Sequence, residues 1–301
     1  MSVEQWKRAI SLTVLIVILF LVGAVGVLSM KLHHANAALE KKSVIDLEDY
    51  TGLQIEDGRN LLGYLEQIYK SGQASYQNKY PALYVENDFQ YVDTPQKTCY
   101  LTFDDGPTED ITEQVLDILK AQDVKATFFV VGKEGKAYVP LYKRIVEEGH
   151  TIAIHTYSHD YDAIYQSVDA YLQDFERIET MIEEVTGAKP EIFRFPGGSV
   201  NGYNAGIYQE LIAEMIRRGY TYYDWNVTSK DTVAGLTADD ILRNVAYAAD
   251  EMDEDIIVLM HDGENHQATV EALPRMIADL KRQGYEFAGL DKDVEPVCFG
   301  Y

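Results

Sequence analysis

From residue 97 onward, short apolar runs alternate with amphipathic stretches, and this alternation limits the possible folds more than any other feature of the chain. Apolar runs of strand length separated by helical periodicity predict parallel strands joined by crossover helices. The expected strands are residues 99–103, 126–131, 151–154, 191–195, 221–225, 256–260 and, more weakly, 286–288. The expected helices are residues 111–121, 139–148, 168–186, 208–218, 238–251 and 270–283.

Residues at the ends of these stretches support the helix boundaries. A glycine stands just past several predicted helix ends, where a left-handed backbone conformation is needed. These glycines are Gly149, Gly187, Gly219 and Gly284. Thr237 and Thr269 stand where helix N-caps belong. About seven strand–helix units in one α/β domain favour a truncated or distorted (β/α) barrel over an open sheet.

The N-terminal end differs in kind from the rest of the chain. Lys7 and Arg8 precede an uncharged apolar run at residues 10–30, which is about the 20 residues that cross a bilayer as a helix. Because basic residues stay in the cytoplasm, residues 1–37 predict a single-pass membrane anchor with the large domain outside the cell. The alternative is a secretory signal sequence, since residues 35–37 have the small-x-small form of a cleavage site. The protein would then be secreted.

Residues 38–96 are polar and rich in tyrosine, and they predict a stalk or linker with one short amphipathic helix. Residues 97–301 then form the candidate catalytic domain. An extracytoplasmic location would permit a disulfide between Cys99 and Cys298, but the sequence does not give their separation. Metal binding by cysteine is not expected, because the chain has no C-x-x-C spacing. The net charge of −23 argues against nucleic acid as a partner, because phosphates bind clusters of Lys and Arg.

Polar side chains stand at the carboxyl ends of several predicted strands, and in such folds these ends build the active site. Each alone has an ordinary structural interpretation: H-x-x-x-H can be two surface histidines, an arginine a structural ion pair, and paired glycines a tight turn. Their joint occurrence at one rim of the fold favours function. The residues are Asp104, Asp105, His155, His159, Arg194, Gly197, Asp231 and His261.

Two imidazoles and one carboxylate form a ligand set that is typical of a catalytic zinc with one position open for water. Asp105, His155 and His159 supply this set. Such a metal lowers the pKa of a water molecule toward about 7 and polarises a carbonyl group. The sequence therefore predicts a divalent metal cofactor, with zinc as the expected ion.

The remaining residues suit metal-assisted hydrolysis of an amide or ester. Asp104 can take the proton of the attacking water as general base, and Arg194 would hold it ionised and oriented. His261 can protonate the leaving group, with Asp231 favouring its charged form. The backbone N–H of Gly197 can join the metal in stabilising the oxyanion.

Between residues 97 and 290 the chain resembles the polysaccharide deacetylases of the NodB-homology family, carbohydrate esterase family 4. The resemblance is carried by five ordered motifs: T-F-D-D-G, H-T-Y-S-H, R-F-P-G-G, S-K-D and L-M-H. It implies a distorted barrel, a zinc-like metal and removal of N-acetyl groups from N-acetylglucosamine polymers. It also implies the roles given above, and it makes Leu259 and Trp225 walls of the pocket for the acetyl methyl group.

One motif departs from the family pattern D-S-x-D-W. The chain keeps Asp231, but Thr228 and Thr232 stand in place of the first aspartate and the final tryptophan. The departure affects the expected fit of the substrate rather than catalysis.

Three functions are open on this sequence. The first is a metal-dependent N-deacetylase acting on peptidoglycan or another cell-envelope polymer that contains N-acetylglucosamine. The second is an esterase that removes O-acetyl groups from xylan-like glycans, because the same attack by water serves both bonds. The third is a catalytically inactive glycan-binding module, which the complete set of expected ligands and carboxylates disfavours.

Overall fold

The computed structural model describes residues 74–92 and 97–300. The predicted membrane segment, the cleavage pattern and the amphipathic helix of the predicted stalk lie outside these residues. None of the helices in the described part of the chain has the length and apolar character that a membrane span requires.

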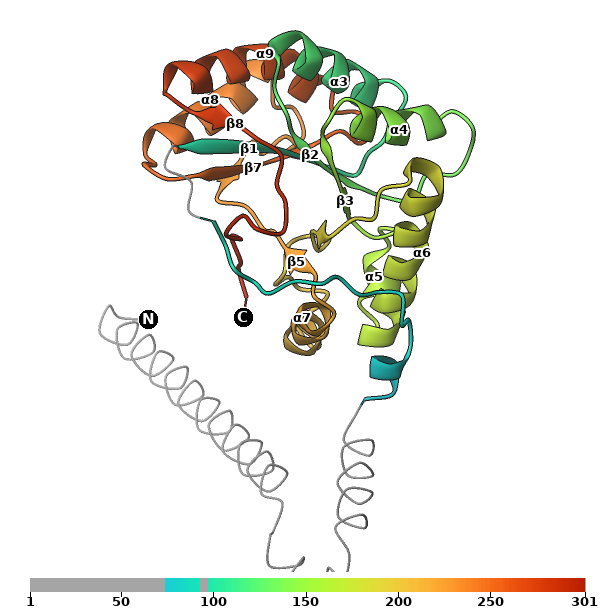
Figure 1. The fold of residues 1–301 in the computed structure, drawn as a ribbon. Coiled ribbons are helices and arrows are strands. Elements are labelled where there is room, and N and C mark those ends of the chain that lie inside the picture. Colours follow the sequence, from blue (N-terminus) through green and yellow to red (C-terminus); the bar gives the residue numbers. More distant parts are fainter. Residues whose placement is uncertain (1–73, 93–96, 301) are drawn as a thin grey trace, which may run out of the picture. The chain divides into compact units, whose positions relative to one another are not determined.

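A parallel sheet organises the domain (Figure 1). Its strands follow the order β5-β4-β3-β2-β1-β7-β6, and β8 pairs with the start of β1. Within residues 74–92 and 97–300 no pairing joins β5 to β6, so the sheet forms a half-barrel that is consistent with the predicted distorted (β/α) barrel. The strands are β1 (Thr98–Asp104), β2 (Thr127–Val130), β3 (Thr151–Ile154), β4 (Ile192–Phe193), β5 (Thr221–Tyr222), β6 (Val227–Thr228), β7 (Ile256–His261) and β8 (Glu286–Phe287).

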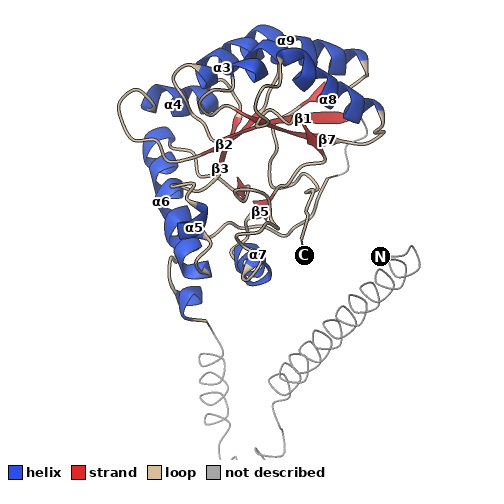
Figure 2. Cartoon of the chain, turned by 180° about the vertical axis from the view of Figure 1, so that it is seen from behind, coloured by secondary structure: helices blue, strands red, loops and turns tan. Residues whose placement is uncertain are grey.

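Helices cover the outer side of the sheet in both views of the chain (Figures 1 and 2). α9 contacts α3 and α8 over β1 and β7, while α6 contacts α4, α5 and α7. The helices are η2 (Ser75–Asn78), α3 (Ile111–Gln122), α4 (Val139–Glu147), α5 (Tyr161–Ile164), α6 (Val168–Thr186), α7 (Tyr208–Arg217), α8 (Ala238–Asp250) and α9 (Gln267–Arg282).

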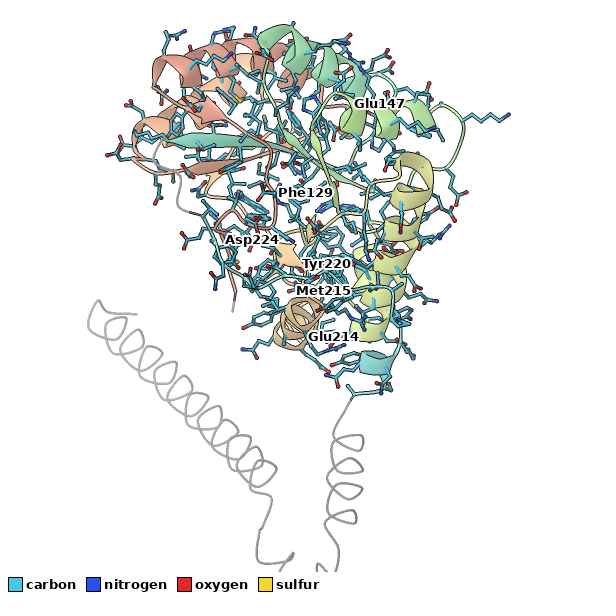
Figure 3. The ribbon with its side chains drawn as sticks, in the orientation of Figure 1. Phe129, Glu147, Glu214, Met215, Tyr220 and Asp224 are labelled. Atoms are coloured by element: carbon cyan, nitrogen blue, oxygen red, sulfur yellow. The ribbon has the colours of Figure 1, made fainter. Side chains whose placement is uncertain are left out.

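The central strand β1 is buried along its whole length, as expected for a parallel strand that is covered on both faces. Leu101 and Phe103 belong to the main core that the sheet shares with the helices. Tyr100 belongs to a second, smaller cluster together with Phe129 of β2, which is labelled in Figure 3. Successive side chains of β1 therefore alternate between two cores, which follows from the period of two in a strand.

The segment 74–92 packs on the end of α7 and on β5. The Val85 N–H donates to the Arg218 carbonyl (2.8 Å), and the Arg218 guanidinium donates to backbone carbonyls between residues 76 and 83. Glycine is required at position 219, because a Cβ there would lie 1.8 Å from the Val85 carbonyl oxygen. The compact unit that contains the sheet begins at Ala74.

Two helix starts show where local patterns succeed and where they fail. Thr237 is the N-cap of α8, as predicted, and its hydroxyl accepts the Asp240 N–H (3.3 Å). Thr269 is not an N-cap: α9 begins at Gln267, and the Thr269 hydroxyl donates to Asp231 Oδ2 (2.8 Å). The second prediction was wrong because the partner of Thr269 comes from a distant strand end, which a local pattern does not register.

Other differences concern short elements. The strand expected at residues 221–225 ends at Tyr222, and the sequence patterns did not predict α5 or β6. Gly187 is the left-handed C-cap of α6 (φ 75°), as its place past a predicted helix end indicated. Cys99 and Cys298 are both free thiols, so the structure contains no disulfide between them.

Candidate active site

Neighbouring strands bring the predicted site residues to one edge of the sheet. Asp104 ends β1 and lies in register with His261, the last residue of β7. His155 directly follows β3, Arg194 directly follows β4, and Asp231 lies in the turn after β6. Since these strands are parallel, their carboxyl ends meet at the same rim, as the sequence predicted.

Asp105, His155 and His159 converge as the predicted metal-binding triad. Asp105 Oδ1 lies 3.6 Å from His155 Nε2 and 3.1 Å from His159 Nε2. One ligand atom from each residue lies within 4.8 Å of the others. Asp105 and His159 both have left-handed backbones (φ 75° and 53°), a conformation that is uncommon for residues other than glycine and recurs at functional sites.

The donor atoms of this triad fit a divalent cation. Asp105 Oδ1 is buried and has no hydrogen-bond partner within the described residues, so no hydrogen bond offsets its desolvation. The His155 Nδ1–H donates to the Arg194 carbonyl (2.9 Å), which leaves the Nε2 lone pair free on the side of Asp105. Burial lowers the pKa of His155 to about 3, so its ring is in the neutral form that binds metal.

Asp104 is bound by a buried arginine. Arg194 Nη1 donates to Asp104 Oδ1 (2.9 Å) and to Thr102 Oγ1 (2.7 Å), and both charged side chains are buried. The other carboxylate oxygen, Asp104 Oδ2, lies 3.7 Å from His155 Nε2, on the side of the triad. Burial raises the pKa of Asp104, although the Arg194 charge opposes the rise. A raised pKa makes this carboxylate a stronger base at the edge of the metal-binding triad.

The Arg194 side chain is itself held in place by several partners. Its Nε donates to the Tyr223 carbonyl (2.8 Å) and its Nη2 to the Asp224 carbonyl (3.0 Å). The guanidinium also lies over the Phe129 ring, 4.2 Å from the centroid. The Asp224 carboxylate, labelled in Figure 3, accepts the N–H (2.8 Å) and hydroxyl (2.6 Å) of Ser199, which ties the loop after β4 to β5.

The Asp231–His261 pair lies at the β6–β7 side of the same rim. The His261 Nδ1–H donates to Asp231 Oδ1 (2.8 Å), while the His261 N–H and the Thr269 hydroxyl both donate to Oδ2 (2.8 Å each). Burial alone lowers the pKa of His261, but the hydrogen bond and charge of Asp231 outweigh it and raise the pKa to about 9. His261 therefore carries a proton near neutral pH.

The predicted pocket residues have different surroundings. Gly197 has a left-handed backbone (φ 76°), and a Cβ there would lie 2.9 Å from a ring carbon of Tyr161. The half-buried Trp225 ring lies 5.7 Å from the Arg194 guanidinium. Leu259 lies in β7, in register with Thr102 on β1. Their part in an acetyl pocket stays a prediction.

Sequence reasoning missed three residues of this rim. The Tyr161 ring contacts His159 edge-on (5.2 Å), and burial with the charges of Asp105 and Asp104 raises its pKa to about 12. Tyr161 follows the predicted metal ligand His159 by two residues, and this position in the sequence could have identified it as part of the site. Thr269 was assigned to a helix cap, and nothing in the local pattern pointed to His266, whose ring stacks on His261 at 5.3 Å.

Comparison with known proteins agrees with this geometry. The chain matches a family model described as polysaccharide deacetylase over residues 91–219. It is 34% identical over 209 residues to the putative polysaccharide deacetylase YheN of Bacillus subtilis (strain 168), which covers 67% of this chain and 70% of the relative. It is 34% identical over 210 residues to a peptidoglycan-N-acetylglucosamine deacetylase of Bacillus cereus, which covers 68% of this chain and 73% of the relative.

A solved structure gives the same result. The catalytic domain of peptidoglycan N-acetylglucosamine deacetylase from Eubacterium rectale ATCC 33656 matches with a TM-score of 0.66 and 34% identity, over 70% of this chain and 96% of that one. The chain therefore belongs to the polysaccharide deacetylase family, a family of deacetylating hydrolases. This confirms the family that the five sequence motifs predicted.

Proposed function

We propose that this chain is a divalent-metal-dependent hydrolase that removes N-acetyl groups from N-acetylglucosamine units of peptidoglycan or a similar cell-envelope polysaccharide. One observation carries the proposal. The buried Asp105 Oδ1 has no hydrogen-bond partner within the described residues and faces the Nε2 atoms of His155 and His159. Two relatives that are peptidoglycan N-acetylglucosamine deacetylases, from Bacillus cereus and Eubacterium rectale, support the choice of substrate.

The residues divide the reaction between two sides of the rim. A divalent metal, zinc in our proposal, held by Asp105, His155 and His159 would make a water molecule more acidic and polarise the acetyl carbonyl. Asp104 accepts a proton from the attacking water through Oδ2, the oxygen that Arg194 does not bind.

The leaving group departs on the other side. As the bond between the acetyl carbon and the amide nitrogen breaks, His261 donates its proton to that nitrogen, which leaves as an amine, and the acetyl group leaves as acetate. Asp231 keeps His261 protonated for this step through the hydrogen bond to Nδ1. The N–H of Gly197 donates to the carbonyl oxygen as negative charge develops on it.

The location of the enzyme is part of the same proposal. The basic pair Lys7 and Arg8 followed by the uncharged run at residues 10–30 supports a single membrane span with the deacetylase domain outside the cell. Full-length protein in washed membranes would agree with the anchor. Mature protein that begins at Ala38 in the culture medium would instead show a cleaved signal sequence.

Mass spectrometry of glycans incubated with the zinc-loaded full chain tests the function. We expect loss of acetyl groups from N-acetylglucosamine oligomers and from peptidoglycan, with the modified sugar assigned after muramidase digestion. Faster release of acetate from acetylated xylan would favour an O-acetyl esterase instead. Binding of all these glycans without release of acetate would leave an inactive glycan-binding module.

A further inference from the structure

An exposed tyrosine stands beside the candidate active site without a part in the chemistry above. Tyr203 lies in the loop between β4 and α7 and is 60% exposed. Its ring centroid lies 4.9 Å from that of Tyr161, whose ring lies 5.2 Å from the ring of His159. Two ring contacts therefore connect an exposed aromatic side chain to the metal-binding triad.

The Tyr161 ring, against which this exposed ring packs, is held in place by its neighbours. It packs edge-on against His159 on one side and Tyr165 on the other (6.0 Å). Gly197 leaves the space that the Tyr161 ring fills, because a Cβ there would lie 2.9 Å away. The Tyr165 hydroxyl donates to the Pro196 carbonyl (2.7 Å). Tyr165, against which Tyr161 packs, is therefore hydrogen-bonded to the loop that carries Tyr203.

Two asparagines hold that loop in its conformation. Asn201 Nδ2 donates to the carbonyls of Pro196 (3.0 Å) and Gly198 (3.1 Å), and its Oδ1 accepts the Tyr203 N–H (2.8 Å). Asn204 is fully buried, and its Nδ2 donates to the Ser199 carbonyl (3.0 Å). A ring presented on a loop that is already ordered loses little conformational entropy when a ligand binds it.

We infer that Tyr203, backed by Tyr161, forms a subsite that binds the pyranose ring of a sugar unit next to the one being deacetylated. This inference rests on the proposed function. A pyranose ring offers an apolar C–H face that packs on an aromatic ring, while its hydroxyls keep their hydrogen bonds with water.

Steady-state kinetics of Tyr203→Ala on N-acetylglucosamine oligomers of increasing length test the subsite. Loss of one stacked ring should raise KM on longer oligomers about fivefold. It should leave kcat nearly unchanged, because Tyr203 does not touch the reacting atoms. The affinity for N-acetylglucosamine itself should not change, since the monosaccharide has no second sugar unit to reach the subsite.

Two further variants separate ring stacking from other effects. Tyr203→Phe keeps the ring and should behave like the native chain. Tyr247→Ala removes a tyrosine of similar character, 72% exposed on α8, and should change neither constant. The inference is wrong if Tyr203→Ala weakens the binding of N-acetylglucosamine itself as much as it raises KM on the oligomers, or if Tyr203→Phe loses as much as Tyr203→Ala.

A direct binding measurement makes the outcome independent of catalysis. Saturation-transfer NMR with a chitin tetramer and the full chain should show contact to one more sugar unit in the native protein than in Tyr203→Ala. If the native chain releases no acetate from any glycan but this difference is present, the proposed function fails and the subsite stands. If acetate is released and the two saturation patterns are identical, the subsite fails and the proposed function stands.

Discussion

The metal-binding triad and the Asp231–His261 pair are both built from imidazoles and carboxylates, but their hydrogen bonds differ. In the triad, Asp105 Oδ1 has no hydrogen-bond partner within the described residues. In the pair, both oxygens of Asp231 accept hydrogen bonds, from the ring and N–H of His261 and from Thr269. The pKa of His155 is lowered to about 3 in the triad, whereas the pKa of His261 is raised to about 9 in the pair.

The two hydrogen-bond patterns suit different ligands, a metal cation in the triad and a proton in the pair. A carboxylate oxygen without a donor and a neutral imidazole attract a cation, and the triad offers both. A carboxylate that accepts several donors stabilises a proton on its histidine partner, and the pair does this. The same residue types are therefore arranged for a metal at one side of the rim and for a proton at the other. Variants on each side should fail in different ways.

The largest effect is expected for Asp104→Asn. It removes the proton acceptor, a role commonly worth about 10²–10⁴ in rate, while the Asp105, His155 and His159 ligands stay intact. Elemental analysis should find the native metal content, and added zinc should not restore kcat. Asp110→Asn, an exposed carboxylate just before α3, serves as the matched control and should keep full activity. Loss of metal in Asp104→Asn would contradict the division of roles.

Asp105→Asn should fail through the metal instead. The change replaces an anionic ligand oxygen with a weaker neutral one, so metal affinity should fall by at least the about 10–100-fold that is typical when only a partner of a metal ligand is lost. Dialysed protein should be nearly inactive, and excess zinc should restore part of kcat. If Asp104→Asn and Asp105→Asn lose metal to the same extent, the two adjacent carboxylates do not have separate roles.

Asp231→Asn should move the basic limb of the pH profile. Without the charge of Asp231, the pKa of His261 should fall from about 9 toward its ordinary 6.5, and the general acid must be protonated to act. At pH 8 the protonated fraction, and with it kcat/KM, should then fall about thirtyfold, whereas at pH 6 the loss should be much smaller. A bound divalent cation would lower the pKa of His261 in the native chain and in the variant alike. The difference in pKa between the two proteins is therefore the quantity to measure. A pH profile that does not move would refute the role of Asp231.

A smaller change is expected for Thr269→Val, which keeps the side-chain shape and removes one donor to Asp231 Oδ2. The Asp231–His261 hydrogen bond remains, so we expect kcat/KM to fall only about threefold, a loss near that of one ordinary hydrogen bond. The basic limb of the pH profile should stay in place. A shift as large as that of Asp231→Asn would mean that Thr269 controls the proton on His261.

The smallest effect on activity is expected for Thr237→Ala, the N-cap of α8. Removal of this N-cap should destabilise the fold by about 1 kcal/mol, measured by urea unfolding. Because the hydrogen bonds of the Thr237 side chain to described residues stay within the first turn of α8, kcat/KM at a temperature well below the melting point should not change. A loss of activity without a loss of stability would place α8 in the site.

The sequence predicted most of the framework because its signals are local. Apolar runs marked β1 and β7, Gly187 marked the end of α6, and Thr237 marked the start of α8. The site residues were predicted from their positions at strand ends, which a parallel sheet brings together without knowledge of side-chain contacts. Their separate chemical roles still await the variants above.

What the sequence did not predict depends on contacts between distant segments. β6 is too short to give an alternating pattern and exists because it pairs with β7. Thr269 was predicted as an N-cap, but it lies inside α9 and its hydroxyl donates to Asp231 Oδ2. The ring contact between Tyr203 and Tyr161 joins a loop to the start of α5, and no sequence pattern encodes such a contact.

Acetate release measured before and after removal of the metal tests the account most directly. The full chain should release acetate from N-acetylglucosamine oligomers, lose this activity when a chelator strips the metal held by Asp105, His155 and His159, and regain it when zinc is returned. The same cycle on Asp104→Asn should rebind zinc without regaining activity. Undiminished acetate release by a chain shown to be free of metal would contradict the account.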